Sequence, residues 1–136
     1  MKVFIGSCPN ERFYSYLLYK LFNYVPKRIE YVKIDKCDTW SMDSTLAKII
    51  HPMLIQLHDK GTPHSRAVEQ EDAPHITFFE GDYSEEAWSY VLGEMIWAFE
   101  QKADDKVMVP YMKPGDVKRM KNGLLMFGKY YENLWD

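Results

Sequence analysis

The sequence predicts an α+β or small α/β fold, in which about four helices form a single layer on a small sheet of two to three short strands. Short runs rich in β-branched and aromatic residues, at 2–6 and 29–34, are typical of strands. Several longer segments repeat apolar residues every three or four positions, as helices with one buried face do. A chain of 136 residues is expected to form a single domain, residues 1–136, and to bury a core without disulfides or metal.

The N-terminal part is expected to form a strand, a helix and a second strand. A turn around Pro9 follows the first strand, and the next helix carries the apolar stripe Tyr14, Leu17, Leu18 and Leu21. Pro26 ends this helix, because helical geometry is disfavoured at the residue before a proline. Two strands joined through a helix favour a right-handed crossover, so parallel pairing is expected.

A second helix is expected at 42–60, with Ser41 as its cap. Asp43 lies in the first turn, where a carboxylate suits the helix dipole. Pro52 removes the backbone hydrogen bond to Lys48, so a kink or a split is expected there. The apolar stripe that should face the core consists of Met42, Leu46, Ile49, Ile50, Met53 and Leu57.

Residues 61–82 are predicted to form a flexible acidic loop, because they contain several glycine and proline residues and the acidic run 69–72. A short additional strand is predicted at 75–79. A capping-box pattern at 82–85 begins the next helix. The apolar stripe of that helix consists of Trp88, Val91, Leu92, Met95 and Phe99.

The last helical segment follows Gly115. Gly123 and Gly128 lie inside it, and each costs about 1 kcal/mol relative to alanine in a helix interior. They are expected either to permit close approach of another backbone or a ligand, or to mark a break at Asn122-Gly123. A coiled-coil-like seam runs along this segment and favours a homo-oligomer; its members are Val117, Met120, Leu124, Phe127, Tyr131 and Leu134.

Composition and charge exclude several classes of protein. The net charge is −3, which argues against general nucleic-acid binding because that function needs a basic face. No apolar run approaches the roughly 18 residues that a membrane-spanning helix needs. Cys8 and Cys37 lie too far apart in the sequence for a disulfide framework or a zinc site, and reduced thiols are typical of a cytosolic protein. Aromatic residues make up 15% of the chain, and Tyr and Trp suit pockets and interfaces.

The turn between the second strand and the second helix holds the densest group of potential ligand-binding side chains. A strand-to-helix turn gathers backbone donors and short polar side chains at one edge, and Trp40 is placed to stack on a ring. The alternative is structural: Asp38 and Ser41 cap the helix while Trp40 covers its first turn. The candidate ligand-binding residues of this turn are Lys36, Asp38, Thr39, Trp40 and Ser41.

Basic and aromatic residues in the last segment form a second candidate surface. They include Lys118, Arg119, Lys121, Lys129, Tyr130 and Tyr131. Such a set suits an anion, but it is also typical of the solvated face of an amphipathic helix. A third set is Glu94 with Tyr90 and Trp97 on one helical face, where the carboxylate either has a raised pKa or is solvated or ion-paired.

Support for catalysis is weak. Asp35, Asp38 and Asp43 are residues of the type that bind Mg²⁺, but their spacing matches no defined metal-binding loop. The sequence contains no Gly-x-Ser-x-Gly motif, and no catalytic residue, metal ligand or cofactor is assigned. Whether the protein is an enzyme stays open at this point, with binding favoured over turnover.

Three stretches, at 34–47, 94–101 and 122–136, contain the strings DTWSMDSTLA, EMIWAFEQ and NGLLMFGKYYENLWD. Together they resemble a family of small proteins encoded by tailed bacteriophages. The resemblance covers much of the chain after Ile34. An aromatic residue is common in that family where Cys37 lies, which argues against a catalytic role for Cys37. The resemblance implies an accessory protein made in the cytoplasm of the bacterial host, and it implies no particular activity.

Small accessory proteins of phages often counter host defences, so the expected function is to bind and sequester a small nucleotide-like signalling molecule without enzymatic turnover. In this hypothesis Trp40 or Tyr130 stacks on the base, and the phosphate-binding residues are Lys36, Arg119 and Lys129. The alternative is inhibition of a host defence or regulatory protein through the acidic run 69–72 and the aromatic helix faces. A third hypothesis is a metal-dependent hydrolase that uses Asp35, Asp38 and Asp43.

Overall fold

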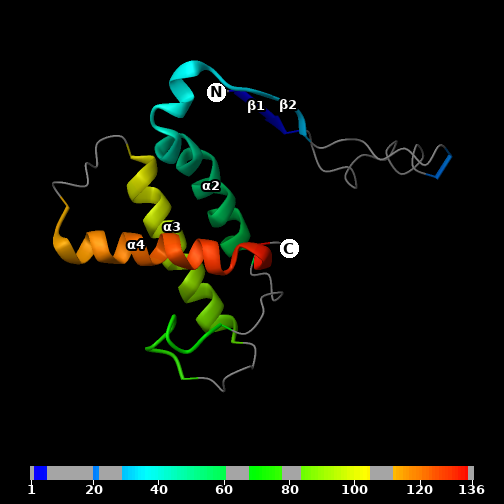
Figure 1. The fold of residues 1–136 in the computed structure, drawn as a ribbon. Coiled ribbons are helices and arrows are strands. Elements are labelled where there is room, and N and C mark those ends of the chain that lie inside the picture. Colours follow the sequence, from blue (N-terminus) through cyan, green and yellow to red (C-terminus); the bar gives the residue numbers. More distant parts are fainter. Residues whose placement is uncertain are drawn as a thin grey trace. The chain divides into compact units, whose positions relative to one another are not determined.

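The structure is a computed structural model that describes residues 2–5, 20–21, 29–60, 68–77, 84–104 and 112–134. The chain divides into two compact units, residues 1–41 and 42–136, and each is described by itself. Figure 1 shows the elements in chain order. They are β1 (Lys2–Ile5), β2 (Ile29–Lys33), the 3-10 turn η2 (Lys36–Thr39), α2 (Met42–Asp59), α3 (Glu85–Ala103), α4 (Pro114–Lys129) and the 3-10 turn η4 (Tyr131–Asn133).

In the unit of residues 1–41, β1 and β2 pair in antiparallel register, with Lys2 opposite Lys33 and Phe4 opposite Tyr31. The predicted parallel pairing is therefore wrong. A long connection allows the second strand to pair with the first in either a parallel or an antiparallel direction, and antiparallel pairs are commoner in proteins. Of the helix predicted between the strands, only residues 20–21 are described, and they are helical; its apolar stripe otherwise lies outside the described residues.

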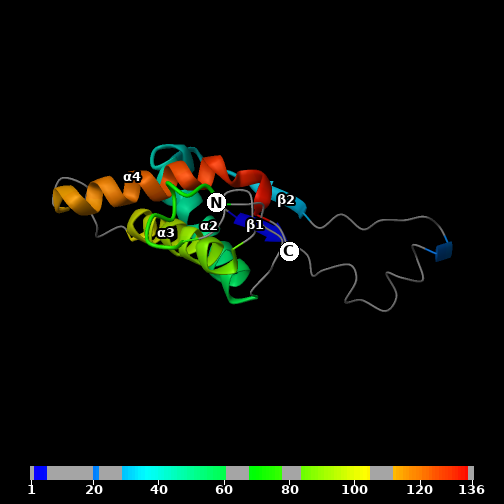
Figure 2. The ribbon, with the colours of Figure 1, turned by 90° about the horizontal axis from the view of Figure 1, so that it is seen from below.

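In the unit of residues 42–136, the described elements are helical, and α3 lies between its two neighbours in the packing. α2 packs on α3, and α4 packs on the same central helix. Figures 1 and 2 show α4 lying across α3. The predicted α+β fold, with helices layered on a small sheet, is wrong, because these helices bury their apolar residues against one another and the described strands pair with each other in the other unit. Residues 75–77 of the predicted additional strand form a turn and a bend.

α3 supplies most of the core, and its predicted apolar stripe is confirmed as buried. The helix begins after Ser84, whose hydroxyl accepts a hydrogen bond from the Ala87 N–H at 3.2 Å. The cap is therefore Ser84 rather than Asp82, the first residue of the predicted capping box. The buried residues of α3 are Ala87, Trp88, Val91, Leu92, Met95, Ala98 and Phe99.

α2 is one continuous helix, so Pro52 does not split it. Its predicted stripe divides into two adjacent faces. On one face, Ile50 and Leu57 of the stripe pack against the core beside the buried Ala47 and Leu54, which the predicted stripe did not include. By contrast, three large side chains that were predicted to be buried are exposed: Met42, Leu46 and Met53.

α4 approaches α3 most closely at Gly123. A Cβ atom at this position would lie 2.5 Å from the backbone oxygen of Glu94 and 2.6 Å from the Cβ of Ala98. The predicted close approach of another backbone is therefore confirmed at Gly123, and α4 continues without a break through Asn122. Gly128 is exposed, and a Cβ atom added at this position would have no other atom within 4 Å.

No helix in the described part of the chain has the length and apolar character that a bilayer crossing requires.

A candidate anion-binding groove between α3 and α4

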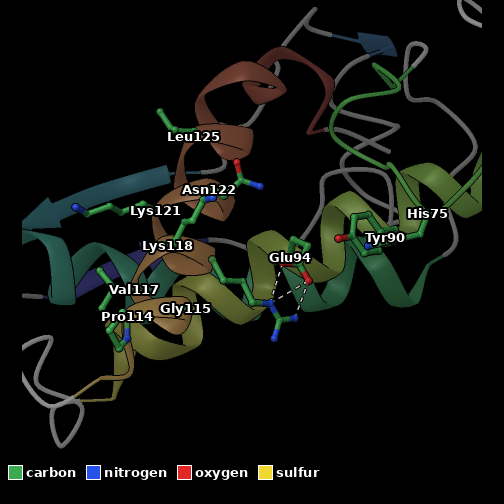
Figure 3. A pocket seen from close by; sticks show the side chains of 11 residues that line it. His75, Tyr90, Glu94, Pro114, Gly115, Val117, Lys118, Lys121, Asn122 and Leu125 are labelled. Carbon is green, nitrogen blue, oxygen red and sulfur yellow. Dashed lines mark hydrogen bonds and ion pairs between the residues drawn. The ribbon is translucent and has the colours of Figure 1, made fainter.

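An open groove of about 1000 Å³ lies over α3 and α4 (Figure 3). Tyr90 and Glu94 enter it from α3, and His75 enters it from the segment 68–77. The ring of His75 meets the ring of Tyr90 edge-on, with centroids 6.4 Å apart. α4 contributes the longer wall, which contains Val117, Lys118, Arg119, Lys121, Asn122 and Leu125.

The helical period explains why these side chains gather. Lys118, Lys121, Asn122 and Leu125 follow one another at steps of three, one and three residues, so they share one face of α4. Because Gly123 lets the α4 backbone approach the backbone of Glu94, a side chain one turn earlier on α4 comes within reach of the Glu94 carboxylate. That side chain is Arg119.

Arg119 is held firmly in the groove. Its Nε lies 3.2 Å and 2.9 Å from the two carboxylate oxygens of Glu94, and its Nη2 lies 2.6 Å from Oε1. The guanidinium carbon lies 4.2 Å from the centre of the Trp97 ring, which is a cation–π distance. The hydrogen bonds that Arg119 donates to the Glu94 carboxylate raise the pKa of Arg119 above its ordinary value. The side chain is still 46% exposed, and within the described residues its Nη1 donates no hydrogen bond, so one edge of the guanidinium faces the solvent.

Two further cations line the same wall. Lys118 and Lys121 are exposed, and neither forms an ion pair with another residue of the described ranges. The groove thus combines three cationic side chains with the single carboxylate of Glu94 among its described lining residues. Although the chain carries a net charge of −3, this surface is locally positive.

The predicted ligand-binding turn lies in the other unit. Within it, the Asp38 carboxylate accepts a hydrogen bond from the Asp35 N–H at 2.8 Å, and the Thr39 hydroxyl donates to the Lys36 carbonyl at 3.1 Å. These polar groups therefore shape the turn itself. Trp40 is 82% exposed, so its ring is largely in solvent. The predicted role of this turn in ligand binding stays a prediction for all five of its residues, Lys36, Asp38, Thr39, Trp40 and Ser41.

Lys129 and Tyr130, the other predicted ligand-binding residues, contact carboxylates of the chain itself. Lys129 Nζ lies 2.7 Å from Glu69 and 2.5 Å from Asp72. The Tyr130 hydroxyl donates to Asp72 at 2.7 Å and accepts from the Glu69 N–H at 3.0 Å. These carboxylates occupy the side-chain groups of Lys129 and Tyr130 that a phosphate would otherwise contact. Lys129 and Tyr130 therefore hold the acidic run 69–72 against the end of α4, and they do not line the groove.

The hypothesis of an acidic metal site finds no support in the geometry. Asp43 pairs with Lys102 of α3 at 2.9 Å, which also lowers the pKa of the Asp43 carboxyl. Nowhere in the described ranges do three acidic, histidine or cysteine side chains come together as a metal site would require.

Sequence reasoning found the parts of the groove but not their combination. The set Tyr90, Glu94 and Trp97 and the set Lys118, Arg119 and Lys121 were predicted as separate candidates, and the structure brings them together across two helices. His75 and Asn122 were missed, because neither belongs to a motif. The one signal in the sequence that connects the two helices is Gly123, where close approach of another backbone was one of the expected outcomes, beside contact with a ligand or a break in the helix.

A second feature missed from the sequence is a histidine–serine pair that links α2 to α3. His58 Nε2 lies 3.0 Å from Ser89 Oγ, while Asp59 Oδ1 lies 3.8 Å from His58 Nδ1. The pair has the composition of a base and a nucleophile. However, the carboxylate is too distant to orient the imidazole by a hydrogen bond, and neither residue lines the groove. Its evident role is to join the two helices.

Comparison of the chain with protein-family models, with curated protein sequences and with solved structures finds no match. The resemblance to a phage protein family therefore stays a prediction.

Proposed function

We propose that this protein binds a small nucleotide-like anion without turnover, and that the ligand lies in the groove between α3 and α4. The observation that carries the proposal is the pair of exposed lysines, Lys118 and Lys121, which have no ionic partner among the described residues and lie beside a fixed arginine and aromatic rings. Cationic side chains that have no ionic partner among the described residues are suited to neutralise a phosphate.

The phosphate is proposed to bind at the basic wall. Lys118 and Lys121 lie about one helical turn apart on the same face of α4, so both ammonium groups can reach one phosphate or two successive phosphates. The open edge of Arg119 supplies planar N–H donors. Because Glu94 and Trp97 already fix this guanidinium, little conformational entropy is lost when the ligand binds.

The base is proposed to lie on the aromatic and apolar part of the groove. Tyr90 offers a ring on which a base can stack. Asn122 carries both a donor and an acceptor, as recognition of a base edge requires. Val117 and Leu125 supply apolar contact. Glu94, the carboxylate that could act as a general base, is engaged by Arg119, which favours binding over turnover.

The biological role proposed for this binding is that of a phage accessory protein that counters host defence by sequestering a signalling nucleotide in the bacterial cytoplasm. This step rests on the resemblance of the strings at 34–47, 94–101 and 122–136. Sequestration requires affinity alone, and an open groove with a locally positive surface is suited to it.

The test is titration calorimetry with adenosine and guanosine mono-, di- and triphosphates and their cyclic forms. We expect Lys118→Ala and Lys121→Ala each to weaken binding of the preferred nucleotide by at least about tenfold, since a charge-assisted hydrogen bond contributes roughly 1.5–3 kcal/mol. Lys48→Ala, on the exposed surface of α2, is the matched control and should bind as the unmodified protein does. Affinity that falls in Lys36→Ala and Trp40→Ala but not in the α4 variants would move the site to the turn at 36–41.

The alternative, inhibition of a host protein through the acidic run 69–72, has less support. Lys129 contacts Glu69, Glu71 and Asp72, so these carboxylates are held at the end of α4 and one of their three negative charges is compensated by this lysine. Deleting the run would also remove the contacts that hold Tyr130, so a lost interaction in such a variant would report on stability as well as on recognition.

A further inference from the structure

The groove over α3 and α4 differs in character between its two ends. Figure 3 shows His75 and Tyr90 together at one end and Lys118 and Lys121 at the other, with Glu94 between them. Arg119 donates hydrogen bonds to the Glu94 carboxylate, so its guanidinium lies between the two ends. The rings of the groove are therefore separated from its two unpaired lysines.

The aromatic end offers a surface for one base. Among the described residues that line the groove, only His75 and Tyr90 carry rings. These rings meet edge-on with centroids 6.4 Å apart, so they form one aromatic corner rather than two separate surfaces. Trp97, about one turn after Glu94 on α3, does not line the groove, and the Arg119 guanidinium covers one face of its ring at 4.2 Å. The described lining thus has no second ring on which another base could stack.

The other end has more positive charge than a single phosphodiester needs. The lining residues Lys118, Arg119 and Lys121 carry three positive charges, and Glu94 offsets one of them, so two remain within the described lining. Asp116 also acts electrostatically on Arg119, but it is not a lining residue. A terminal phosphate monoester carries about two negative charges at pH 7, whereas a phosphodiester carries one. The cationic end therefore matches a terminal phosphate in charge.

We infer that the ligand is a linear mononucleotide with a terminal phosphate, and that the groove discriminates against cyclic nucleotides and dinucleotides. This inference rests on the proposed function and names the class of nucleotide that the groove takes. The base stacks on Tyr90, and the terminal phosphate lies at Lys118 and Lys121 with the open edge of Arg119 beside it.

The cyclic forms fit this arrangement less well. A 3′,5′-cyclic mononucleotide carries one charge and holds its phosphate against the sugar, so the phosphate cannot extend toward the lysines while the base stacks on Tyr90. A cyclic dinucleotide carries two charges, but its phosphates lie between two bases, and one base would then lie at the cationic end without a ring. Volume does not distinguish these ligands, because a groove of about 1000 Å³ can hold either size.

The test is titration calorimetry of the full chain with four ligands of one base at constant ionic strength. The ligands are the 5′-monophosphate, the 5′-diphosphate, the 3′,5′-cyclic monophosphate and the cyclic dinucleotide. We expect the 5′-monophosphate to bind at least about tenfold more tightly than either cyclic ligand, and the diphosphate to bind at least as tightly as the monophosphate. The cyclic dinucleotide is the matched comparison, because its total charge is close to that of the 5′-monophosphate and only the placement of the charge differs.

Variants at each end test where the discrimination arises. Lys118→Ala/Lys121→Ala should bind the linear and the cyclic mononucleotide with similar, weak affinity, because the groups that reach the terminal phosphate are gone. Tyr90→Leu, checked for folding by far-UV circular dichroism, should weaken both mononucleotides by a similar factor and keep their ratio. Lys48→Ala, on the exposed surface of α2, should keep both affinities.

The outcomes separate this inference from the proposed function. A cyclic mononucleotide or dinucleotide that binds as tightly as the 5′-monophosphate overturns the inference and leaves nucleotide binding in place. A preference for the linear form that persists in Lys118→Ala/Lys121→Ala also overturns it, because the discrimination would then arise elsewhere. If none of the four ligands binds in either the adenosine or the guanosine series, the proposed function fails and the inference fails with it.

Discussion

The phenol of Tyr130 links three parts of the helical unit. Its ring meets Trp88 of α3 edge-on at 5.9 Å, and its hydroxyl bridges Asp72 and the backbone of Glu69. Since Tyr130 is almost fully buried, these hydrogen bonds are shielded from water. One side chain thereby fixes residues 68–77 against the end of α4, and this segment in turn places His75 at the groove.

Tyr130→Phe is expected to destabilise the protein by about 1–2 kcal/mol. The ring contact with Trp88 is kept, but the Asp72 carboxylate and the Glu69 N–H lose a partner. The measurement is the free energy of unfolding in urea. Tyr131→Phe is the matched control, because Tyr131 is 65% exposed and its hydroxyl forms no hydrogen bond within the described ranges. Equal stability of the two variants would show that the hydroxyl bridge contributes nothing.

The same contacts predict loss of stability in alkali. Burial raises the pKa of Tyr130 from about 10 to about 12, and the hydrogen bond to Asp72 acts in the same direction. Burial lowers the pKa of Lys129, but its hydrogen bonds to Asp72 and Glu69 outweigh this effect and hold the pKa above its ordinary value. Because the unfolded chain loses these protons first, the stabilisation is complete below about pH 10 and falls as the pH rises toward 12.

Urea unfolding at successive pH values checks this expectation. The free energy of unfolding of the unmodified protein should fall more steeply between about pH 10 and 12 than that of Tyr130→Phe, which lacks the phenol. Parallel curves for the two proteins would contradict a raised pKa at Tyr130.

At the scale of the elements, the crossing of α3 and α4 depends on Gly123. An added Cβ at this position would meet the Glu94 backbone oxygen at 2.5 Å, and a backbone atom cannot move aside as the end of a flexible side chain can. Gly123→Ala should therefore destabilise the protein by about 1–3 kcal/mol, in spite of the better helix propensity of alanine. It should also weaken nucleotide binding, because moving α4 outward separates Arg119 from Glu94.

Gly128→Ala is the control for Gly123→Ala. The position is on the same helix, is exposed, and has no atom within 4 Å of an added Cβ. Alanine there should stabilise the protein by up to about 1 kcal/mol through helix propensity alone. Thermal unfolding of the two variants compares them directly, and a shift in the same direction for both would disprove the close-packing account of Gly123.

The helices of residues 42–136 were predictable from the sequence, but the neighbouring helix that covers each of their faces was harder to predict. Periodicity identified the buried stripe of α3, because that helix is covered on its apolar face by both neighbours. In α2 the same kind of pattern merged two adjacent faces into one, since the spacing of apolar residues does not show which of them a neighbouring helix covers. Of the two effects expected of Pro52, a kink or a split, the split is absent, because α2 continues through this residue.

For the whole molecule, the main error was the α+β architecture. Residues 2–5 and 29–33 are strands, as their composition indicates, but they pair in antiparallel register in a unit of their own while the helices of residues 42–136 pack on one another. The spacing of apolar residues along the sequence predicts individual helices and strands. Which of these elements pack on one another is decided by tertiary contacts, and the spacing carries no information about those.

The candidate groove was likewise predictable in its parts but not in its assembly. Its charged and aromatic residues were recognisable as two separate sets, but the groove exists only where α4 crosses α3 (Figure 3). Lys129 and Tyr130 appeared equally suitable for a ligand in the sequence. Their actual partners, Glu69 and Asp72, lie about 60 residues earlier in the chain, and no local signal connects them.

Native mass spectrometry of the full chain, after incubation with a small-molecule extract of phage-infected bacteria, tests nucleotide binding in the groove most directly. The unmodified protein and Lys48→Ala should carry an added mass in the range of a nucleotide, which is released on denaturation. The double variant Lys118→Ala/Lys121→Ala should lack that mass. An unmodified protein with no added mass, or a double variant that retains the ligand, would contradict the assignment of the α3–α4 groove.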